Sequence, residues 1–199
     1  APASLDVVAL ASARETQGTH RLAIVAADAT ELTKKLEQVI AKLVDTEVEP
    51  FKTRNGIHYG VGAAPGKLCF LFPGEGSQYP QMLGDVATHF PCVRDWFDFI
   101  EHSALGRGSP SRAAVLFPPP TGLTEAQRRE REDRLYGMDT AAESVFAAGM
   151  GLHALFTELG FAPDALLGHS TGENTALTAG KVNRAKDRGA IARAVTDLN

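Results

Sequence analysis

Cysteine, long hydrophobic runs and excess positive charge are all scarce in this 199-residue chain. The 2 cysteines, Cys69 and Cys92, form neither a disulfide framework nor a metal-ligand spacing, so we expect buried bystanders and no bound metal. No apolar stretch approaches the roughly 20 residues that span a bilayer, and no signal-type segment opens the chain, so we expect a cytoplasmic protein without a membrane partner. The 20 basic residues are scattered and the formal net charge is -4, which argues against nucleic-acid binding.

The hydrophobic residues that are present, 44% of the chain, suffice for one ordinary domain and a smaller unit. Residues 21–26 form a short apolar run, and residues 31–43 carry apolar side chains at helical spacing after a capping segment at Asp28. A second strand-like run, residues 57–62, follows a turn-prone Arg-Asn-Gly sequence. These patterns predict a small α+β unit over residues 1–66.

The main domain is predicted to begin at residue 67, where strand-like and helical patterns alternate. The predicted elements are a buried strand at 67–72, a helical stretch at 81–99 broken by Pro91, a charged, solvated helix at 124–134 capped by Thr124, an amphipathic helix at 141–159 ended by Gly160, and a buried strand at 165–167. Alternation of this kind predicts an α/β fold over residues 67–199, with a parallel sheet and flanking helices.

The most informative motif is G-H-S-T-G at residues 168–172, a serine between two glycines, after a predicted strand and before a predicted helix. A turn this tight strains the serine backbone, and the glycines let neighbouring chain approach. Ser170 is then exposed at a helix N-terminus, where the helix dipole favours negative charge on a bound carbonyl. The pattern is typical of a nucleophile elbow and predicts acyl transfer through a serine ester; the alternative is a Gly-Ser turn without chemical importance.

A glycine-rich loop, P-G-E-G-S-Q at residues 73–78, follows the first strand of the predicted sheet. Such a loop exposes backbone N–H groups that can bind a phosphate or an oxyanion. It lacks the ending of a Walker loop and the three-glycine spacing of a dinucleotide fingerprint, so a nucleotide site is a weak hypothesis. If the two strands are neighbours, both loops open at the carboxyl edge of the sheet, and the N–H groups of Glu75 and Thr171 form one oxyanion hole.

Together the two motifs resemble a known family. The first, F-P-G-E-G-S-Q at residues 72–78, and the second, G-H-S-T-G-E at residues 168–173, are similar to F-P-G-Q-G-S-Q and G-H-S-x-G-E of the malonyl-CoA:acyl-carrier-protein transacylases, the acyltransferases of fatty acid and polyketide synthases. Residues 5–64 resemble the linker subdomain that joins a ketosynthase to such an acyltransferase. Glu75 and the Tyr79-Pro80 pair resemble synthases of polyunsaturated fatty acids or enediynes.

The resemblance implies an α/β-hydrolase-like acyltransferase core preceded by the α+β linker subdomain. In such a core, a malonyl or related acyl group passes from coenzyme A, through an ester on Ser170, to the phosphopantetheine thiol of an acyl carrier protein. It implies no bound cofactor, an acyl-CoA substrate, and a carrier protein and an adjacent ketosynthase domain as partners. His169 and Gln78 are implied to line the substrate site, with a packed histidine as the alternative for His169.

Two parts of the family pattern are not matched clearly. The general base of the family is a histidine far downstream of the serine, so we interpret residues 67–199 as the amino-terminal part of an acyltransferase core whose histidine lies beyond the chain. The arginine that binds a malonyl carboxylate follows the serine by some two dozen positions. Arg193 is therefore the first candidate and Arg188 the next, with a solvated helix arginine as the alternative.

Two other functions compete with this interpretation. An α/β serine hydrolase or thioesterase has the same elbow but releases its acyl group to water, so thioester hydrolysis would exceed transfer to a carrier protein. A non-catalytic scaffold module would keep the fold and bind a carrier protein without becoming acylated. The sequence does not determine which acyl group is transferred.

Overall fold

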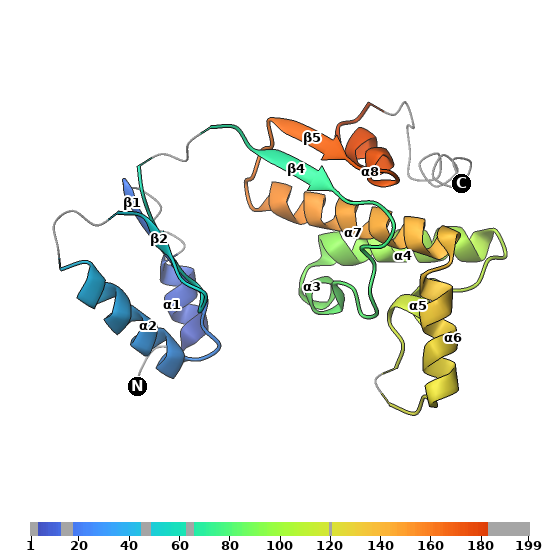
Figure 1. Cartoon of the computed structure of the whole chain (residues 1–199), viewed down its shortest axis with the longest axis horizontal. Helices are drawn as coiled ribbons and strands as arrows, with labels where there is room; N and C mark the ends of the chain where they lie inside the picture. The colour runs from blue at the N-terminus through green and yellow to red at the C-terminus, as the bar shows by residue number, and fades with distance from the viewer. Residues whose placement is uncertain (1–3, 13–17, 45–48, 63–65, 120, 183–199) are drawn as a thin grey trace. The chain divides into compact units, whose positions relative to one another are not determined.

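The computed structural model of the chain divides into two compact units, Ala1–Gly66 and Lys67–Asn199, called here the first and second unit (Figure 1). The described residues are 4–12, 18–44, 49–62, 66–119 and 121–182. Each unit has its own sheet, antiparallel in the first and parallel in the second. The interpretation of the first unit as a linker subdomain stays a prediction.

The described part of the first unit forms a three-stranded antiparallel sheet in the order β1-β3-β2, with two helices beside it. Its elements are α1 (Leu5–Ser12), β1 (His20–Ile24), α2 (Ala29–Lys42), β2 (Phe51–Lys52) and β3 (Ile57–Val61). Gly56, with φ of 86°, makes the turn between β2 and β3, since side-chain-bearing residues rarely adopt this conformation. Helix α1 and strand β2 are additions to the elements that the sequence predicts.

Local hydrogen bonds explain where α2 begins. Asp28 is its N-cap, and the carboxylate accepts a hydrogen bond from the Glu31 backbone N–H at 2.8 Å, which confirms the predicted cap. The buried Lys35 ammonium donates to the Val25 carbonyl at 2.6 Å and pairs with the Glu31 carboxylate, so its charge is satisfied. The small core of this unit contains the buried side chains of Val39, Ile57 and Tyr59.

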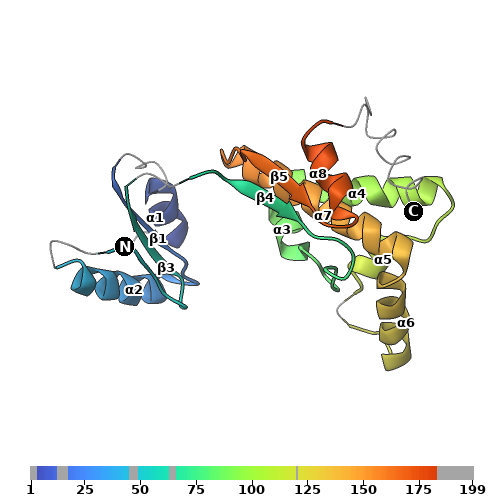
Figure 2. The same ribbon diagram turned by 45° about the horizontal axis from the view of Figure 1, so that its top comes forward.

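The described part of the second unit contains two parallel strands, with helices packed on one side (Figures 1 and 2). Its elements are β4 (Cys69–Phe72), α3 (Gly84–His89), α4 (Pro91–Gly106), α5 (Ala113–Leu116), α6 (Glu125–Leu135), α7 (Met138–Glu158), β5 (Ala165–Gly168) and α8 (Gly172–Ala179). In the register of the pair, Phe72 lies opposite Gly168. The last residues of both strands therefore meet at one edge of the sheet.

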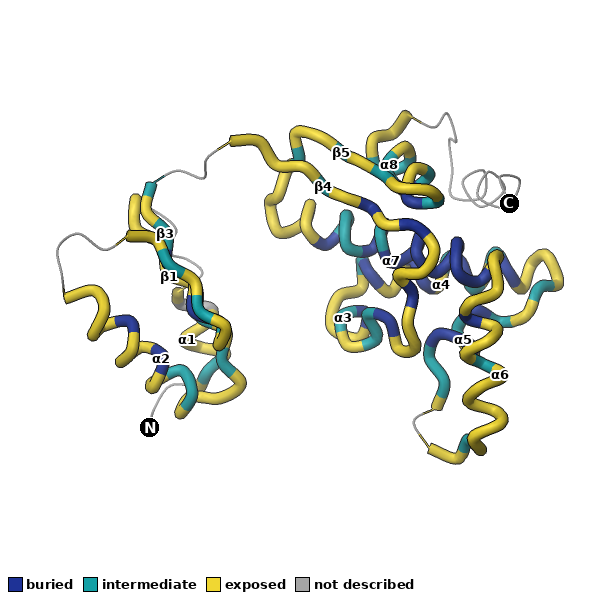
Figure 3. Tube along the Cα trace, in the orientation of Figure 1, coloured by how far each residue is buried: buried dark blue, intermediate teal, exposed yellow. Residues whose placement is uncertain are grey.

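Helices α4 and α7 pack together to form the main core (Figure 3). Trp96 of α4 meets Phe146 of α7 edge to face, with ring centroids 5.9 Å apart. Gly151 of α7 brings the two helices close, because a Cβ there would lie 3.1 Å from Val93 Cγ1. Trp96 and Phe97 are both buried in this core.

The helix boundaries follow recognisable signals. Thr124 and Gln127 form a capping box at the start of the charged helix α6, as the sequence predicts. Pro91 ends the first helical stretch, but it also starts α4, because proline fits the first helical position, where its missing N–H has no intrahelical partner. Helix α4 then continues to Gly106, beyond the predicted end at residue 99.

A buried carboxylate joins α7 to the segment that precedes α5. The Glu143 carboxylate accepts hydrogen bonds from Arg112 Nε at 2.7 Å and from Arg107 Nη2 at 2.5 Å. Glu143 and Arg112 are both buried, while Arg107 is more exposed. Pairing on both carboxylate oxygens compensates for the loss of hydration of this charge.

One face of the β4–β5 pair is open among the described residues. Phe70 and Phe72 face α7, where both rings contact the His153 imidazole. Leu71 and Leu167, which alternate with the covered positions, are 69% and 59% exposed. The prediction of strands buried on both faces is therefore right for one face only.

Cys69 also corrects a prediction. Its side chain is exposed on β4 instead of buried, because it alternates with Phe70 and therefore lies on the open face with Leu71. Cys92 of α4 is partly buried, and burial together with the nearby Glu158 carboxylate raises the pKa of its thiol. None of the described helices is long and apolar enough to span a bilayer.

Candidate active site

Ser170 lies in a tight turn between β5 and α8. It is exposed and has φ of 55°, the left-handed conformation that a side-chain-bearing residue seldom adopts. The flanking glycines have no room for a side chain: a Cβ at Gly168 would overlap the Gly172 carbonyl oxygen, and a Cβ at Gly172 would overlap the Phe72 carbonyl oxygen. This geometry is that of a nucleophile elbow.

The first glycine-rich loop passes directly beside this turn. The His169 backbone N–H donates to the Phe72 carbonyl at 3.0 Å, which extends the pairing of the strands into the loops. Gly74 is buried, and a Cβ on it would lie 2.8 Å from both the His169 carbonyl oxygen and Ser170 Cβ. Two segments almost a hundred residues apart in the sequence are therefore in contact at the candidate nucleophile.

Two side chains hold the shape of the first loop. Gln78 is buried, and its Oε1 accepts a hydrogen bond from the Gly76 N–H at 2.8 Å. The Ser77 hydroxyl donates to the Gly74 carbonyl at 2.9 Å. The loop backbone on either side of Glu75 is thereby fixed by its own residues.

The Glu75 side chain makes a contact that the sequence did not predict. Ser170 Oγ donates a hydrogen bond to Glu75 Oε2 at 3.2 Å, and both side chains are exposed. Only the backbone N–H of Glu75 was expected to take part in the site. The signal in the sequence that could have predicted this contact was Glu75 itself. The malonyl-CoA:acyl-carrier-protein transacylases, which the motif resembles, usually have glutamine at this position.

The other predicted site residues are placed as follows. Thr171 is the N-cap of α8, and its buried Oγ1 has no hydrogen-bond partner among the described residues. His169 is exposed beside Ser170, so it is not a packed histidine within this part of the chain. Arg193 and Arg188 lie outside the described residues. The structure thus brings Ser170, Glu75, Thr171 and His169 together at the sheet edge where β4 and β5 end. Gln78 contributes by holding the backbone of the first loop.

An apolar cavity of about 670 Å³ lies beside the loop, between β4, α7 and residues 77–83. Phe70, Phe72, Leu152 and His153 are among its lining residues, and Pro73 and Ser77 connect it to the first loop. Burial, with a smaller contribution from the positive charge of Lys181, lowers the pKa of His153, so the neutral imidazole is favoured there. The cavity can accommodate an apolar chain next to the glycine-rich loop.

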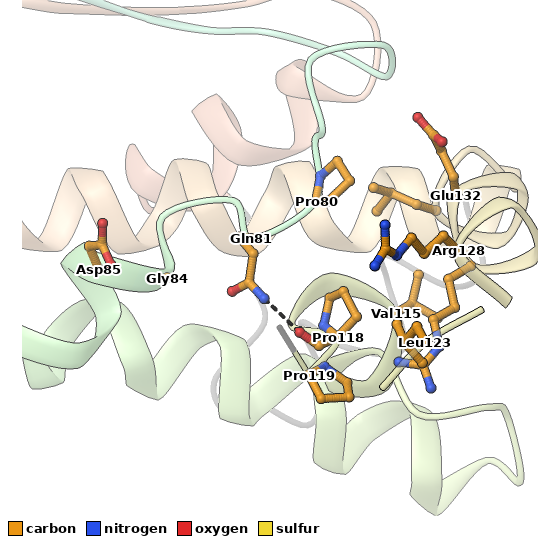
Figure 4. Close-up of a pocket in the computed structure, with 12 residues that line it drawn as sticks. Pro80, Gln81, Gly84, Asp85, Val115, Pro118, Pro119, Leu123, Arg128 and Glu132 are labelled. Carbon is orange, nitrogen blue, oxygen red and sulfur yellow. Dashed lines mark hydrogen bonds between the residues drawn. The ribbon is translucent and has the colours of Figure 1, made fainter. Parts of the chain in front are cut away.

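A second cavity, of about 660 Å³, lies between residues 80–85 and α6 (Figure 4). Arg128 and Glu132 of α6 line it together with Pro118, whose carbonyl accepts a hydrogen bond from Gln81 Nε2 at 2.8 Å. The elbow residues do not line this cavity. We therefore assign it no part in the candidate site.

Known sequences similar to this chain include polyketide synthases and a polyunsaturated fatty acid synthase, and no family model matches it. It is 28% identical over 186 residues to the non-reducing polyketide synthase PKS8-1 of Pseudocercospora fijiensis, which covers 92% of this chain and 9% of the relative. It is 28% identical over 178 residues to part of a polyunsaturated fatty acid synthase of Thraustochytrium sp., covering 84% and 6%. For polyketide synthase GfsA of Streptomyces halstedii, identity is 32% over 168 residues, covering 84% and 2%. The chain thus spans less than a tenth of these relatives.

Solved structures of similar fold include two acyltransferase domains. The acyltransferase domain of ZmaA has a TM-score of 0.71 at 20% identity, covering 92% of this chain and 38% of that chain. The acyltransferase domain from the second module of the salinomycin polyketide synthase has a TM-score of 0.63 at 25% identity, covering 94% and 39%. The predicted α/β fold class is therefore confirmed. So is the resemblance to polyketide synthase acyltransferase domains and malonyl-CoA:acyl-carrier-protein transacylases.

Proposed function

We propose that this chain contributes the nucleophile of an acyltransferase, which moves a malonyl or related acyl group from coenzyme A to an acyl carrier protein. The observation that supports the proposal is the exposed, left-handed Ser170 in an elbow that contacts the Gly74 loop. One solved structure of similar fold is a malonyl transacylase in complex with an acyl carrier protein, at 27% identity and a TM-score of 0.50, covering 65% of this chain and 37% of that chain.

In the first half-reaction, Ser170 Oγ attacks the thioester carbonyl. An ester C–O bond forms, the C–S bond to coenzyme A breaks, and the hydroxyl proton ends on the departing thiol. The carrier-protein phosphopantetheine thiol then attacks the ester, and the serine recovers a proton as the acyl thioester leaves. The general base is proposed to be the downstream histidine of the family.

The backbone N–H groups of Glu75 and Thr171 are proposed to hold the oxyanion that forms on the acyl carbonyl. Each such donor contributes roughly 3 kcal/mol to transition-state stabilisation in comparable sites. Thr171 starts α8, so the helix dipole also favours the negative charge. His169 and Gln78 are proposed to shape the acyl site, and Arg193 to bind a carboxylate of the acyl group.

The same proposal implies the substrates, the partner proteins and the cellular location. The substrates are an acyl-CoA and a phosphopantetheine-bearing carrier protein, and no cofactor is bound. We also propose that the first unit links the acyltransferase to an adjacent ketosynthase, and that the protein acts in the cytoplasm. Polyketide synthases among the relatives support the setting.

Intact-mass spectrometry after incubation with malonyl-CoA and other acyl-CoA thioesters tests the proposal. We expect one acyl adduct that disappears in Ser170→Ala, and transfer of the group on addition of a phosphopantetheine-loaded carrier protein. Ser103→Ala, the same change on α4, is the matched control and keeps the adduct. No adduct in protein that includes the proposed downstream histidine, or the same adduct in Ser170→Ala, would contradict the proposal. Release to water in preference to the carrier would indicate a hydrolase.

A further inference from the structure

The candidate nucleophile is hydrogen-bonded to an anionic side chain. Ser170 Oγ lies 3.2 Å from Glu75 Oε2, and these residues come from loops that follow two different strands. An ionised carboxylate only accepts hydrogen bonds, so the serine hydroxyl donates its proton in this contact. The consequence is a negative charge within hydrogen-bond distance of the oxygen that forms the acyl ester.

The position of this carboxylate depends on the loop backbone. Gly74 packs against the serine turn, and Gly76 has φ of 96°. The Gly76 N–H is held by the buried Gln78 side chain, so the residues on both sides of Glu75 are fixed. Glu75 is therefore held beside Ser170 by the fold, while its side chain is exposed to solvent.

Among the described residues, Glu75 takes part in none of the ion pairs. Glu173 adds a second carboxylate in the first turn of α8. Across the first loop and residues 168–182 the basic side chains are His169 and Lys181, and Lys181 follows the opposite end of α8. The start of α8 therefore carries more negative than positive side-chain charge.

The negative charge of Glu75 should have a different effect on acyl groups that carry a carboxylate than on acyl groups that do not. A malonyl group places its own carboxylate two bonds beyond the carbonyl that Ser170 attacks, whereas an acetyl group has no charge there. Two like charges near 4 Å apart cost a factor of about five even in bulk water, and more where the substrate excludes water. On the basis of the proposed function, we infer that Glu75 determines specificity by disfavouring carboxylate-bearing acyl groups on Ser170 relative to uncharged ones.

A competition experiment tests the inference in the full chain. Acetyl-CoA and malonyl-CoA are supplied together, and the ratio of the two initial acylation rates is measured by intact mass. Glu75→Gln removes the charge and preserves the shape. We expect it to raise the malonyl-to-acetyl ratio at least about fivefold, equivalent to about 1 kcal/mol. Glu75→Asp, which keeps the charge, should retain most of the original preference.

Glu132→Gln is the matched control, because it removes one carboxylate from α6, which packs on α5 and α7, and should leave the ratio unchanged. Raising the salt concentration to about 1 M should weaken the preference in the unaltered chain and have little effect in Glu75→Gln. Because the ratio is measured within one sample, partial misfolding of a variant does not change it.

Three results would overturn the inference. An unchanged ratio in Glu75→Gln would show that the carboxylate does not discriminate between acyl groups. An equal decrease of the acetylation and malonylation rates in Glu75→Gln would show that Glu75 acts in a step common to both substrates and does not determine specificity. If protein that includes the proposed downstream histidine forms no Ser170-dependent adduct with either substrate, the proposed function itself fails. That outcome differs from the other two, in which an adduct forms.

Discussion

At the residue scale, Gly74 has room for a hydrogen atom but not for a methyl group. We expect Gly74→Ala to lower the Ser170 acylation rate at least tenfold, because the new Cβ would lie 2.8 Å from Ser170 Cβ and from the His169 carbonyl oxygen. Initial rates by intact mass, with circular dichroism to check folding, provide the measurement. Gly106→Ala is the control, since nothing lies within 4 Å of its Cβ position. Equal rates in both variants would show that the two loops do not need this close approach.

His153 gives a second prediction at this scale. Its pKa is lowered, chiefly by burial, so the folded state binds a proton less readily than the unfolded state, where the value is about 6.5. As the pH falls below about 6.5, the unfolded state is protonated first, and the free energy of unfolding should decrease. Urea titrations at several pH values measure the change, and the decrease should be smaller in His153→Gln.

The control for this prediction is His102→Gln. His102 is exposed on α4 and bonds only to the Asp98 carbonyl in its own helix among the contacts described. This variant should keep the pH dependence of the unaltered chain. A slope that is the same in His153→Gln as in the unaltered chain would contradict the role of burial at His153.

At the element scale, the connection between α7 and the segment before α5 depends on Glu143. We expect Glu143→Ala to lower the free energy of unfolding by about 3–5 kcal/mol, because it leaves the buried Arg112 guanidinium without its charge partner. Urea denaturation measures the loss.

Glu130→Ala is the matched change on an exposed helix, where the ion pair with Arg134 is largely solvated. The expected loss there is at most about 1 kcal/mol. Similar losses in the two variants would mean that the buried pair adds no more than a surface pair.

The sequence predicted helix boundaries correctly where a few neighbouring residues determine them. Asp28 and Thr124 mark helix starts by side-chain caps, and Gly160 ends α7 with φ of 87°. Strand β2, Phe51–Lys52, has only two residues, too few to show a period. Helix α1 was missed for a related reason, since L-D-V-V-A-L-A-S has almost no polar residue to define a helical face.

The candidate site divides in the same way. Ser170 and its glycines form one local motif, and the structure shows the strained turn that the motif predicts. The Glu75 side-chain contact depends on the register of β4 with β5, which no short motif encodes. Exposure of Cys69 was also missed, because an apolar run does not reveal which face of a sheet is covered.

At the scale of the whole molecule, each unit has its own sheet and its own buried side chains. The apolar run of β4 predicted burial on two faces, and the described residues cover one. The relatives and the solved acyltransferases compared with this chain are longer, and it spans 38% and 39% of the two acyltransferase domains. Activity, substrates and partners therefore stay proposals that the acylation experiments decide.

The pairing of β4 with β5 has a consequence for the order in which the contacts of the second unit can form during synthesis. Phe72 meets Gly168 only after the intervening helices have been made and have folded back, so the contact has high sequence separation. Closing such a long loop costs more chain entropy than closing the short turns of the helices inside it. In a chain growing on the ribosome, the segments that form the intervening helices are therefore made before β4 and β5 can pair and bring the Gly74 loop to the Ser170 turn.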